Sequence, residues 1–168
     1  YRSPGTRLVL KSPIHTARIP DLLETFPDAR FVYIHRDPYE VYPSTLHMVK
    51  ALHPYIALQD PRHDDLETLA LANGEMMFRR YEEDRRLLPE GRLHEIAYED
   101  LVRDPLAALE ELYGALELGD FETMRQTYRE MARELSAYRP RSHALPEAAR
   151  RHLNARWPGP CRRYGHIA

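Results

Sequence analysis

The stretch Arg30–Ser44, RFVYIHRDPYEVYPS, decides the fold of this chain. An apolar run ends just before Arg36, and Asp37 and Pro38 then open a helical pattern. This order predicts a buried strand that turns into a helix, with Arg36 at the strand's carboxyl end and Ser44 two turns into the helix. In open α/β sheets ligands bind at that edge. An arginine beside a helix N-terminus therefore predicts an anion site, the alternative being a surface ion pair and a solvated serine.

The length and composition are those of one globular domain, and the small net charge means that any anion site is local. The chain has 168 residues, of which 43% are apolar and 30% charged, as is ordinary for a globular protein. A net charge of −2 gives no overall attraction to nucleic acid or anionic membranes. Cys161 is the single cysteine, which excludes an internal disulfide and favours a reducing compartment. No apolar stretch is long enough to span a bilayer.

The order of elements predicts a parallel sheet. A short buried strand at Arg7–Lys11, a helix at about 16–26 and a strand at about 31–34 form a βαβ unit. Asp37 then caps a helix to about 52, with Pro38 in its first turn and Glu40 completing a capping box. Further signals predict a loop at about 53–63, a helix at about 64–88, a strand at about 92–98, and helices at about 105–116, 121–138 and 146–156.

Four motifs in this order resemble the sulfotransferases that use PAPS (3′-phosphoadenosine 5′-phosphosulfate), most closely their mainly bacterial group. They are KSPIH at 11–15, HRDP at 35–38, YEDL at 98–101 and the YGH ending at 164–166. In that family an arginine that ends a strand and a serine eight residues later bind the 3′-phosphate, and Arg36 and Ser44 match this spacing. The resemblance covers nearly the whole chain. It implies a single domain over 1–168 with a P-loop-NTPase-like parallel sheet, flanking helices and a helix-rich C-terminal half.

One element of the family is absent from this sequence. The first strand and its glycine-rich phosphosulfate loop have no counterpart, since Ser3-Pro4-Gly5-Thr6 precedes the family's second strand. The chain begins at Tyr1 without a methionine or a leader. We therefore expect a domain that lacks its N-terminal strand, loop and helix and is weak or inactive as it stands. The Lys11 strand would then have an unpaired apolar edge, which favours a homo-oligomer.

The resemblance also assigns catalytic roles. Lys11 would stabilise the charge on the leaving group. His15 is a candidate general base because histidine can take a proton from a hydroxyl or amine. The family's cytosolic branch places its histidine two residues after the lysine, where this chain has Pro13. A glutamate of the long helix is therefore the alternative base, with three candidates: Glu67, Glu75 and Glu82.

Three further residues are assigned to the cofactor by resemblance. Tyr98 would lie near the adenine, where ring stacking is suitable, or else be a core tyrosine. Arg139 and Arg141, in a basic loop with His143, would add a second phosphate contact, or else form a solvated charge cluster. No histidine pair has the spacing of a metal site, so no metal is expected.

The predicted activity is transfer of a sulfuryl group from PAPS to a hydroxyl or amine of a small-molecule, glycan or peptide acceptor. The chemistry requires positioning and positive charge. One alternative is a nucleotide-binding module without catalysis. Another is a different P-loop-class transferase, such as a nucleotide kinase. The HRD triplet at 35–37 also imitates the protein-kinase catalytic loop, but Tyr42 stands where that loop needs asparagine. We expect a cytoplasmic protein with no nucleic-acid partner.

Overall fold

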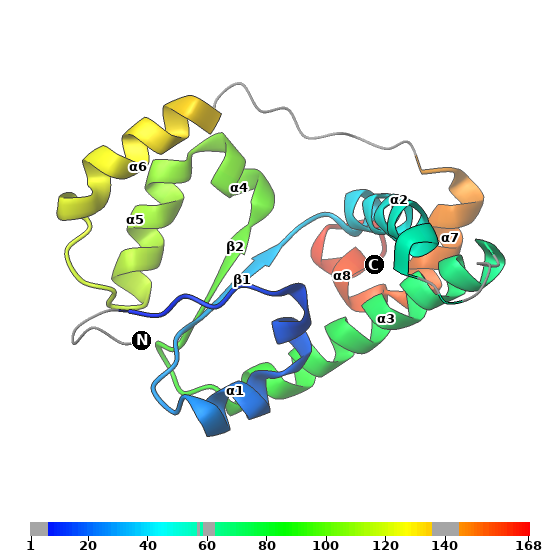
Figure 1. Ribbon diagram of the computed structural model, residues 1–168, viewed down its shortest axis with the longest axis horizontal. Helices are drawn as coiled ribbons and strands as arrows, with labels where there is room; N and C mark the ends of the chain where they lie inside the picture. The colour runs from blue at the N-terminus through cyan, green and yellow to red at the C-terminus, as the bar shows by residue number, and fades with distance from the viewer. Residues whose placement is uncertain (1–6, 57, 59–62, 136–144) are drawn as a thin grey trace.

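The computed structural model describes residues 7–56, 58, 63–135 and 145–168. At its centre β1 (Phe31–His35) and β2 (Leu93–Ala97) pair in parallel, with Phe31 opposite Leu93 and His35 opposite Ala97. Parallel neighbours need a long crossover, and two long helices, α2 and α3, supply it. Figure 1 shows α4, α5 and α6 on one side of the sheet and α2, α3, α7 and α8 on the other.

Helices make up most of the rest of the described chain. Two of them, η1 and η2, are short 3-10 helices. The bounds are η1 Pro13–Ala17, α1 Ile19–Thr25, α2 Pro38–Ile56, α3 His63–Asp84, η2 Arg85–Leu87, α4 Tyr98–Arg103, α5 Pro105–Ala115, α6 Glu122–Leu135, α7 Glu147–Arg156 and α8 Pro158–Arg163.

The helices that begin at strong capping signals lie where the sequence predicts them. Asp104 is the clearest case, since its Oδ1 accepts the Ala107 N–H at 3.1 Å and Pro105 opens α5. Two short helices were not predicted. α4 begins directly after β2, and α8 begins at Pro158 because proline suits the first position of a helix.

The strand predicted at Arg7–Lys11 is wrong, and with it the βαβ unit that would join it to β1. No strand forms among residues 7–12, and Leu8, Val9 and Leu10 are 59%, 82% and 50% exposed. An apolar run forms a strand only where a neighbouring strand and a buried face stabilise it. The partner of β1 is β2 instead.

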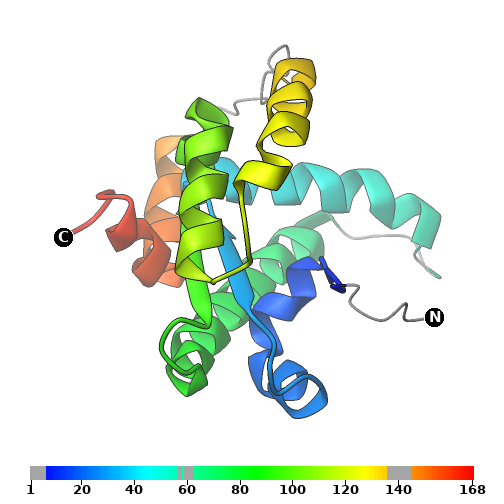
Figure 2. The same ribbon diagram turned by 90° about the vertical axis from the view of Figure 1, so that its left-hand side faces the viewer.

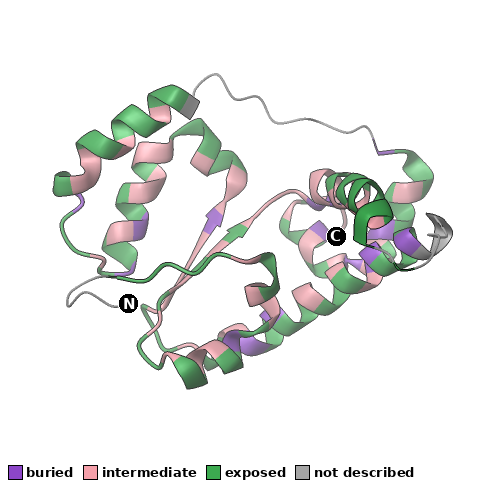
Figure 3. Cartoon of the chain, viewed as in Figure 1, coloured by how far each residue is buried: buried purple, intermediate pink, exposed green. Residues whose placement is uncertain are grey.

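Two apolar clusters form the core. The larger joins α2, α3, α7 and α8 and contains Tyr42, Leu71, Leu145, Leu153, Trp157 and Cys161. The smaller packs Ile96 of β2 against Leu112 and Leu116 of the α5 region. Figure 3 shows buried residues gathered at these two places, while much of α6 is exposed. The indole N–H of Trp157 donates to the Leu71 carbonyl at 2.9 Å, which fixes α7 against α3.

The two faces of the sheet differ in how well they are covered. On one face Tyr33 stacks on Tyr81 of α3, with ring centroids 3.8 Å apart. On the other face α5 lies beside β2, as Figure 2 shows from the side, and packs against Ile96. Val32 and Ile34 of β1 stay 45% and 51% exposed on this face. Among the described residues the second edge of β1 has no strand partner. The unpaired apolar edge expected at Lys11 thus belongs to β1.

Candidate functional site

The turn from β1 into α2 is bonded on both sides. Asp37 Oδ1 accepts the Tyr39 N–H at 2.8 Å, so Asp37 caps α2 as predicted. The Asp37 N–H, which a capping box would give to Glu40, donates to Glu99 Oε1 of α4 at 3.4 Å. The turn that carries Arg36 is therefore held by two carboxylates. One is that of Asp37, within the turn, and the other is that of Glu99 in α4.

Arg36 lies at this turn against the ring of Tyr98. The guanidinium carbon is 4.5 Å from the ring centroid, and Nη2 is 3.7 Å from Glu40 Oε2. The side chain of Arg36 is 27% exposed. Tyr98 directly follows β2, so the two parallel strands deliver Arg36 and Tyr98 to the same edge of the sheet. The guanidinium is supported by an aromatic face and keeps part of its surface open to an anion.

Ser44 is exposed in the second turn of α2, where the sequence predicts it. Glu40 lies one helical turn before Ser44 and pairs with Arg36, so Glu40 and Ser44 share one side of α2. The Glu40 carboxylate would weaken the attraction of an anion to this side of the helix. That Arg36 and Ser44 bind one ligand stays a prediction.

Lys11 and His15 lie on a different segment, ahead of α1. Lys11 is exposed in irregular chain rather than at the end of a strand. His15 lies in η1, which packs against α3, and its Nδ1 is buried with no hydrogen-bond partner among residues that the structure describes. The catalytic roles of Lys11 and His15 remain predictions.

The three glutamates considered as alternative bases each bind a partner from another element. A carboxylate engaged in this way holds the fold together and is less available for proton transfer. The pairs are Glu67 with the Tyr42 hydroxyl at 2.6 Å, Glu75 with Arg156 at 2.6 Å and Glu82 with Arg163 at 3.4 Å.

The basic loop that carries Arg139, Arg141 and His143 lies outside the described residues. In the part of the chain that is described, no group of three or more His, Cys, Asp or Glu side chains is arranged to hold a metal ion. Nor does any described helix combine the length and the apolar character needed to cross a membrane.

Two residues near the C-terminus, Tyr164 and His166, also contact the residues of this turn, and the sequence did not predict them. The Tyr164 hydroxyl is 2.9 Å from His35 Nδ1 and donates to Glu99 Oε2 at 3.2 Å. His166 Nε2 is 2.8 Å from Asp37 Oδ1. The YGH ending was the available signal, but its contact with residues 129 positions earlier cannot be read from spacing.

Burial and nearby charges shift two ionisable groups at this turn. Burial, followed by the Arg163 charge, lowers the pKa of His35, while Glu95, Glu99 and Asp100 oppose that shift. His35 is therefore stabilised as the neutral imidazole. Burial, together with the Asp37 charge, raises the pKa of the Cys161 thiol to about 11, so this thiol stays protonated and unreactive.

A second polar cluster lies under the sheet and was also missed. Glu95 Oε1 accepts from the Tyr81 hydroxyl at 2.5 Å and from Arg85 at 3.0 Å, and Arg163 is 3.4 Å away. Burial acts to raise the pKa of Glu95, but the Tyr81 hydrogen bond and the two arginines outweigh it and leave that pKa lowered. Burial raises the pKa of Tyr33 to about 12. The cluster ties α3 and α8 to β2, which is a structural role.

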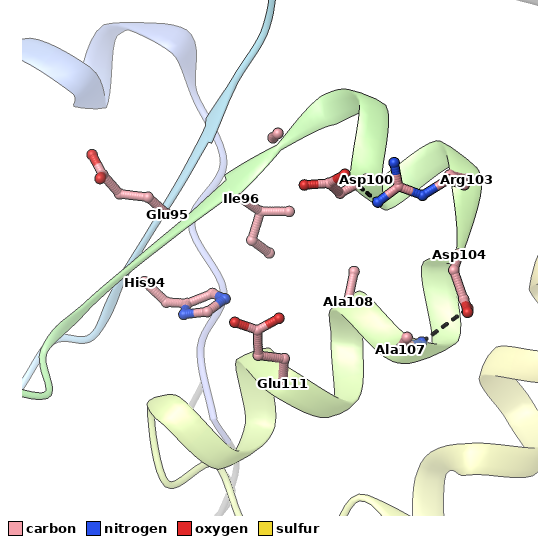
Figure 4. A pocket seen from close by; sticks show the side chains of 10 residues that line it. His94, Glu95, Ile96, Asp100, Arg103, Asp104, Ala107, Ala108 and Glu111 are labelled. Atoms are coloured by element: carbon pink, nitrogen blue, oxygen red, sulfur yellow. Dashed lines mark hydrogen bonds and ion pairs between the residues drawn. The ribbon is translucent and has the colours of Figure 1, made fainter. Parts of the chain in front are cut away.

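A hollow of about 240 Å³ opens between β2, α4 and α5 (Figure 4). It is smaller than the roughly 300–1,000 Å³ of a typical ligand pocket. His94 and Glu111 point toward each other across it, and Asp100 and Arg103 form an ion pair at its rim. None of the predicted site residues lines it. We therefore locate the candidate site at the β1–α2 turn and not in this hollow.

Comparison with known proteins bears on the family to which this chain is similar. A model of the sulfotransferase family matches residues 1–123. Two curated relatives, from Mycobacterium bovis (strain ATCC BAA-935 / AF2122/97) and Mycobacterium tuberculosis (strain CDC 1551 / Oshkosh), are named omega-hydroxy-beta-dihydromenaquinone-9 sulfotransferase Stf3. Each is 39% identical over 159 residues, which cover 95% of this chain and 41% of the relative. The chain thus spans less than half the length of these relatives.

The fold is similar to that of a solved structure. The crystal structure of sulfotransferase STF9 from Mycobacterium avium matches with a TM-score of 0.73 and 21% identity, over 93% of this chain and 41% of that one. At this identity the likeness bears on the fold alone. It confirms the predicted class: an incomplete α/β fold with a parallel sheet, flanking helices and a helix-rich C-terminal half.

Proposed function

The chain belongs to the sulfotransferase family, and from this premise we propose that it serves transfer of a sulfuryl group from PAPS to an acceptor hydroxyl or amine. The observation that supports this most is the position of Arg36. It directly follows the parallel strand β1, precedes the N-terminus of α2 and keeps 27% of its side chain exposed beside the Tyr98 ring. A bidentate guanidinium at a helix N-terminus is suited to a phosphate.

The residues at this turn fit one end of the cofactor. Arg36 and Ser44 would bind the 3′-phosphate, and Tyr98 would lie between the guanidinium and the adenine. When bound, PAPS supplies the sulfuryl group that is transferred. Arg139 and Arg141 are proposed as additional phosphate contacts on the evidence of the sequence alone. Lys11 is proposed to stabilise the leaving charge.

His15 is proposed as the general base. The three glutamates all bind arginine or tyrosine, which supports His15 over them. His15 would take the proton of the acceptor hydroxyl or amine as the acceptor's oxygen or nitrogen bonds to sulfur. The bond from sulfur to the bridging oxygen of PAPS would break in the same step, with 3′,5′-ADP as the leaving group.

For the acceptor we favour a hydroxyl on an apolar small molecule. The curated relatives are named for a hydroxylated dihydromenaquinone, which has this character. Support comes from α2, where Met48, Leu52, Tyr55 and Ile56 repeat at helical spacing and are 52%, 49%, 86% and 73% exposed. A stripe of this kind offers apolar surface to such a molecule.

Two further features of the proposal rest on other observations. The free, buried Cys161 is consistent with a reducing compartment such as the cytoplasm. Val32 and Ile34 are exposed beside the edge of β1 that has no strand partner within the described ranges, and this favours self-association of the chain.

A binding experiment tests the assignment of Arg36. Calorimetry would compare 3′,5′-ADP with 5′-AMP, which lacks the 3′-phosphate. We expect the unmodified chain to prefer 3′,5′-ADP by roughly tenfold or more, as a charge-assisted contact implies. Arg36→Ala should bring the ratio of the two dissociation constants close to one, and Ser44→Ala should reduce it in part.

Arg103→Ala is the matched control, because Arg103 is 75% exposed and pairs with Asp100 on its own helix. It should leave the nucleotide ratio unchanged. Full retention of the 3′-phosphate preference in Arg36→Ala would contradict the assignment. Preference for 3′,5′-ADP without sulfuryl transfer from PAPS to any acceptor would favour a binding module over an enzyme.

A further inference from the structure

We infer that Tyr164 and His166 are positioning residues for Arg36, because they hold the two residues on either side of it. Tyr164 contacts His35 and His166 contacts Asp37, at 2.9 Å and 2.8 Å. The inference rests on the proposed function, since it assigns these residues to the same phosphate site. It adds a role for the C-terminal segment that contacts no ligand itself.

The contacts of Tyr164 determine which groups donate and which accept hydrogen bonds at its hydroxyl. Its hydroxyl has one proton, which it donates to the Glu99 carboxylate at 3.2 Å. The His35 Nδ1–H then donates to the Tyr164 oxygen. Burial and the Arg163 charge keep His35 neutral, in agreement with this tautomer. Glu99 also accepts the Asp37 N–H at 3.4 Å, so this chain of contacts ends at the backbone of the turn.

His166 holds the other side of the turn through its ring and its Nε2–H. The Nε2–H donates to Asp37 Oδ1, the same oxygen that caps α2 by accepting the Tyr39 N–H. The imidazole also stacks on the Tyr39 ring, with centroids 3.7 Å apart and planes 3° apart. The Tyr39 hydroxyl donates to Asn154 of α7 at 3.0 Å. Asp37 is therefore fixed by the first turn of α2, which follows it, and by the C-terminal segment.

The C-terminal segment is itself anchored in the core. Cys161 of α8 is fully buried, and the His166 N–H donates to its carbonyl at 2.9 Å. Gly165 has φ +71°, a conformation that favours glycine and lets Tyr164 and His166 both contact the turn. By contrast, the contacts of the Arg36 side chain, a 3.7 Å ion pair and a 4.5 Å ring contact, are individually weak. The direction of Arg36 is therefore determined mainly by the backbone that the C-terminus holds.

Substitutions of His166 and Tyr164 separate positioning from mere folding. His166→Ala removes the donor and the ring, His166→Gln keeps a donor, and Tyr164→Phe removes only the hydroxyl. We expect His166→Ala to weaken 3′,5′-ADP binding about tenfold and Tyr164→Phe about fivefold, with 5′-AMP binding unchanged in both. His166→Gln should recover binding to within about threefold.

Tyr113→Phe is the matched control, because it removes a hydroxyl bonded to Tyr128 at 2.9 Å far from this turn. It should change neither nucleotide constant. Amide hydrogen exchange gives a second readout that needs no ligand. The amides of residues 37–41 should exchange about tenfold faster in His166→Ala while those of α5 keep their rates.

The outcomes distinguish this inference from the proposed function. If Arg36→Ala removes the preference for 3′,5′-ADP while His166→Ala and Tyr164→Phe keep it, the positioning role is wrong and the phosphate site stands. If the two variants weaken both nucleotides equally and speed exchange throughout the chain, the contacts are only structural and the inference is overturned. If Arg36→Ala keeps the preference, both proposals fail.

Discussion

The β1–α2 turn and the segment at 7–17 both have sequences that point to a strand end with a cationic side chain, yet they differ in structure. The turn at Arg36 receives hydrogen bonds from α4 and from the C-terminal segment. The segment around Lys11 forms no strand, and three successive apolar side chains there are at least half exposed. The first is a turn that distant partners hold, whereas residues 7–12 of the second form no strand.

Partners that are distant in the sequence determine which of the two apolar patterns forms a strand. β1 has β2 beside it and α3 beneath it, whereas the described residues supply no neighbouring strand for Leu8–Leu10. Propensity is similar in the two runs, since both are rich in leucine, valine or isoleucine. Packing decides between them.

We expect the largest effect on stability from a substitution in the apolar core between α3 and α7. A Cβ at Gly74 would lie 2.1 Å from a ring carbon of Trp157, so Gly74→Ala should lower the free energy of unfolding by about 3 kcal/mol. Urea denaturation followed by circular dichroism measures this loss. The cause is direct overlap between α3 and the indole that joins it to α7.

Two substitutions serve as controls for that measurement. Gly114→Ala in α5 meets no atom within 4 Å and should stabilise the chain by about 0.5–1 kcal/mol, because alanine favours a helix. Val9→Ala, in the exposed segment, should change stability by less than about 0.5 kcal/mol. A loss at Val9 as large as that at Gly74 would break the contrast between the two regions.

Prediction from the sequence succeeded for features that depend on neighbouring residues and failed for a feature that needs a distant partner. Asp37-Pro38 and Asp104-Pro105 locate two helix starts because capping depends on neighbours in the sequence. The assignment of Arg36 and Ser44 to a phosphate site stays a prediction, which rests on their spacing and on the family resemblance. The strand at Arg7–Lys11 was wrong because strand formation depends on a partner that local sequence does not reveal.

The contacts that support Arg36 could not be predicted at all. Tyr164 and His166 are separated from their partners His35 and Asp37 by 129 residues, and no periodicity links the two stretches. The cluster around Glu95 is similar, because it joins side chains from β2, α3, η2 and α8. Such networks follow from the tertiary arrangement, which local patterns do not determine.

A smaller effect concerns how the stability of the chain depends on pH through His35, which lies at the β1–α2 turn. Burial and the Arg163 charge lower the pKa of His35 below its ordinary value of 6.5, so the unfolded chain binds its proton first as the pH falls. Stability contributed by neutral His35 is therefore present above pH 6.5 and is lost as the pH falls from 6.5 toward the lowered pKa of the folded state. Urea midpoints at pH 7.5 and 5.5 should show this loss.

His35→Gln should reduce that loss, because glutamine does not titrate. His152→Gln, at an exposed position on α7, is the control and should keep the pH dependence of the unmodified chain. If His35→Gln and His152→Gln respond to acid in the same way, His35 is not the group that couples the turn to pH.

The smallest effect should come from the Glu40 carboxylate, which pairs with Arg36. Glu40→Gln removes a negative charge 3.7 Å from the guanidinium, and both side chains are about one quarter exposed, so solvent screens much of the interaction. We expect 3′,5′-ADP to bind two- to threefold more tightly, by roughly 0.5 kcal/mol, with no change for 5′-AMP. Calorimetry on Glu40→Gln, with Glu83→Gln on α3 as control, measures it. Weaker binding of 3′,5′-ADP would mean that Glu40 orients Arg36 more than it repels the phosphate, and that the turn depends on its own side chains as well as on the C-terminal segment.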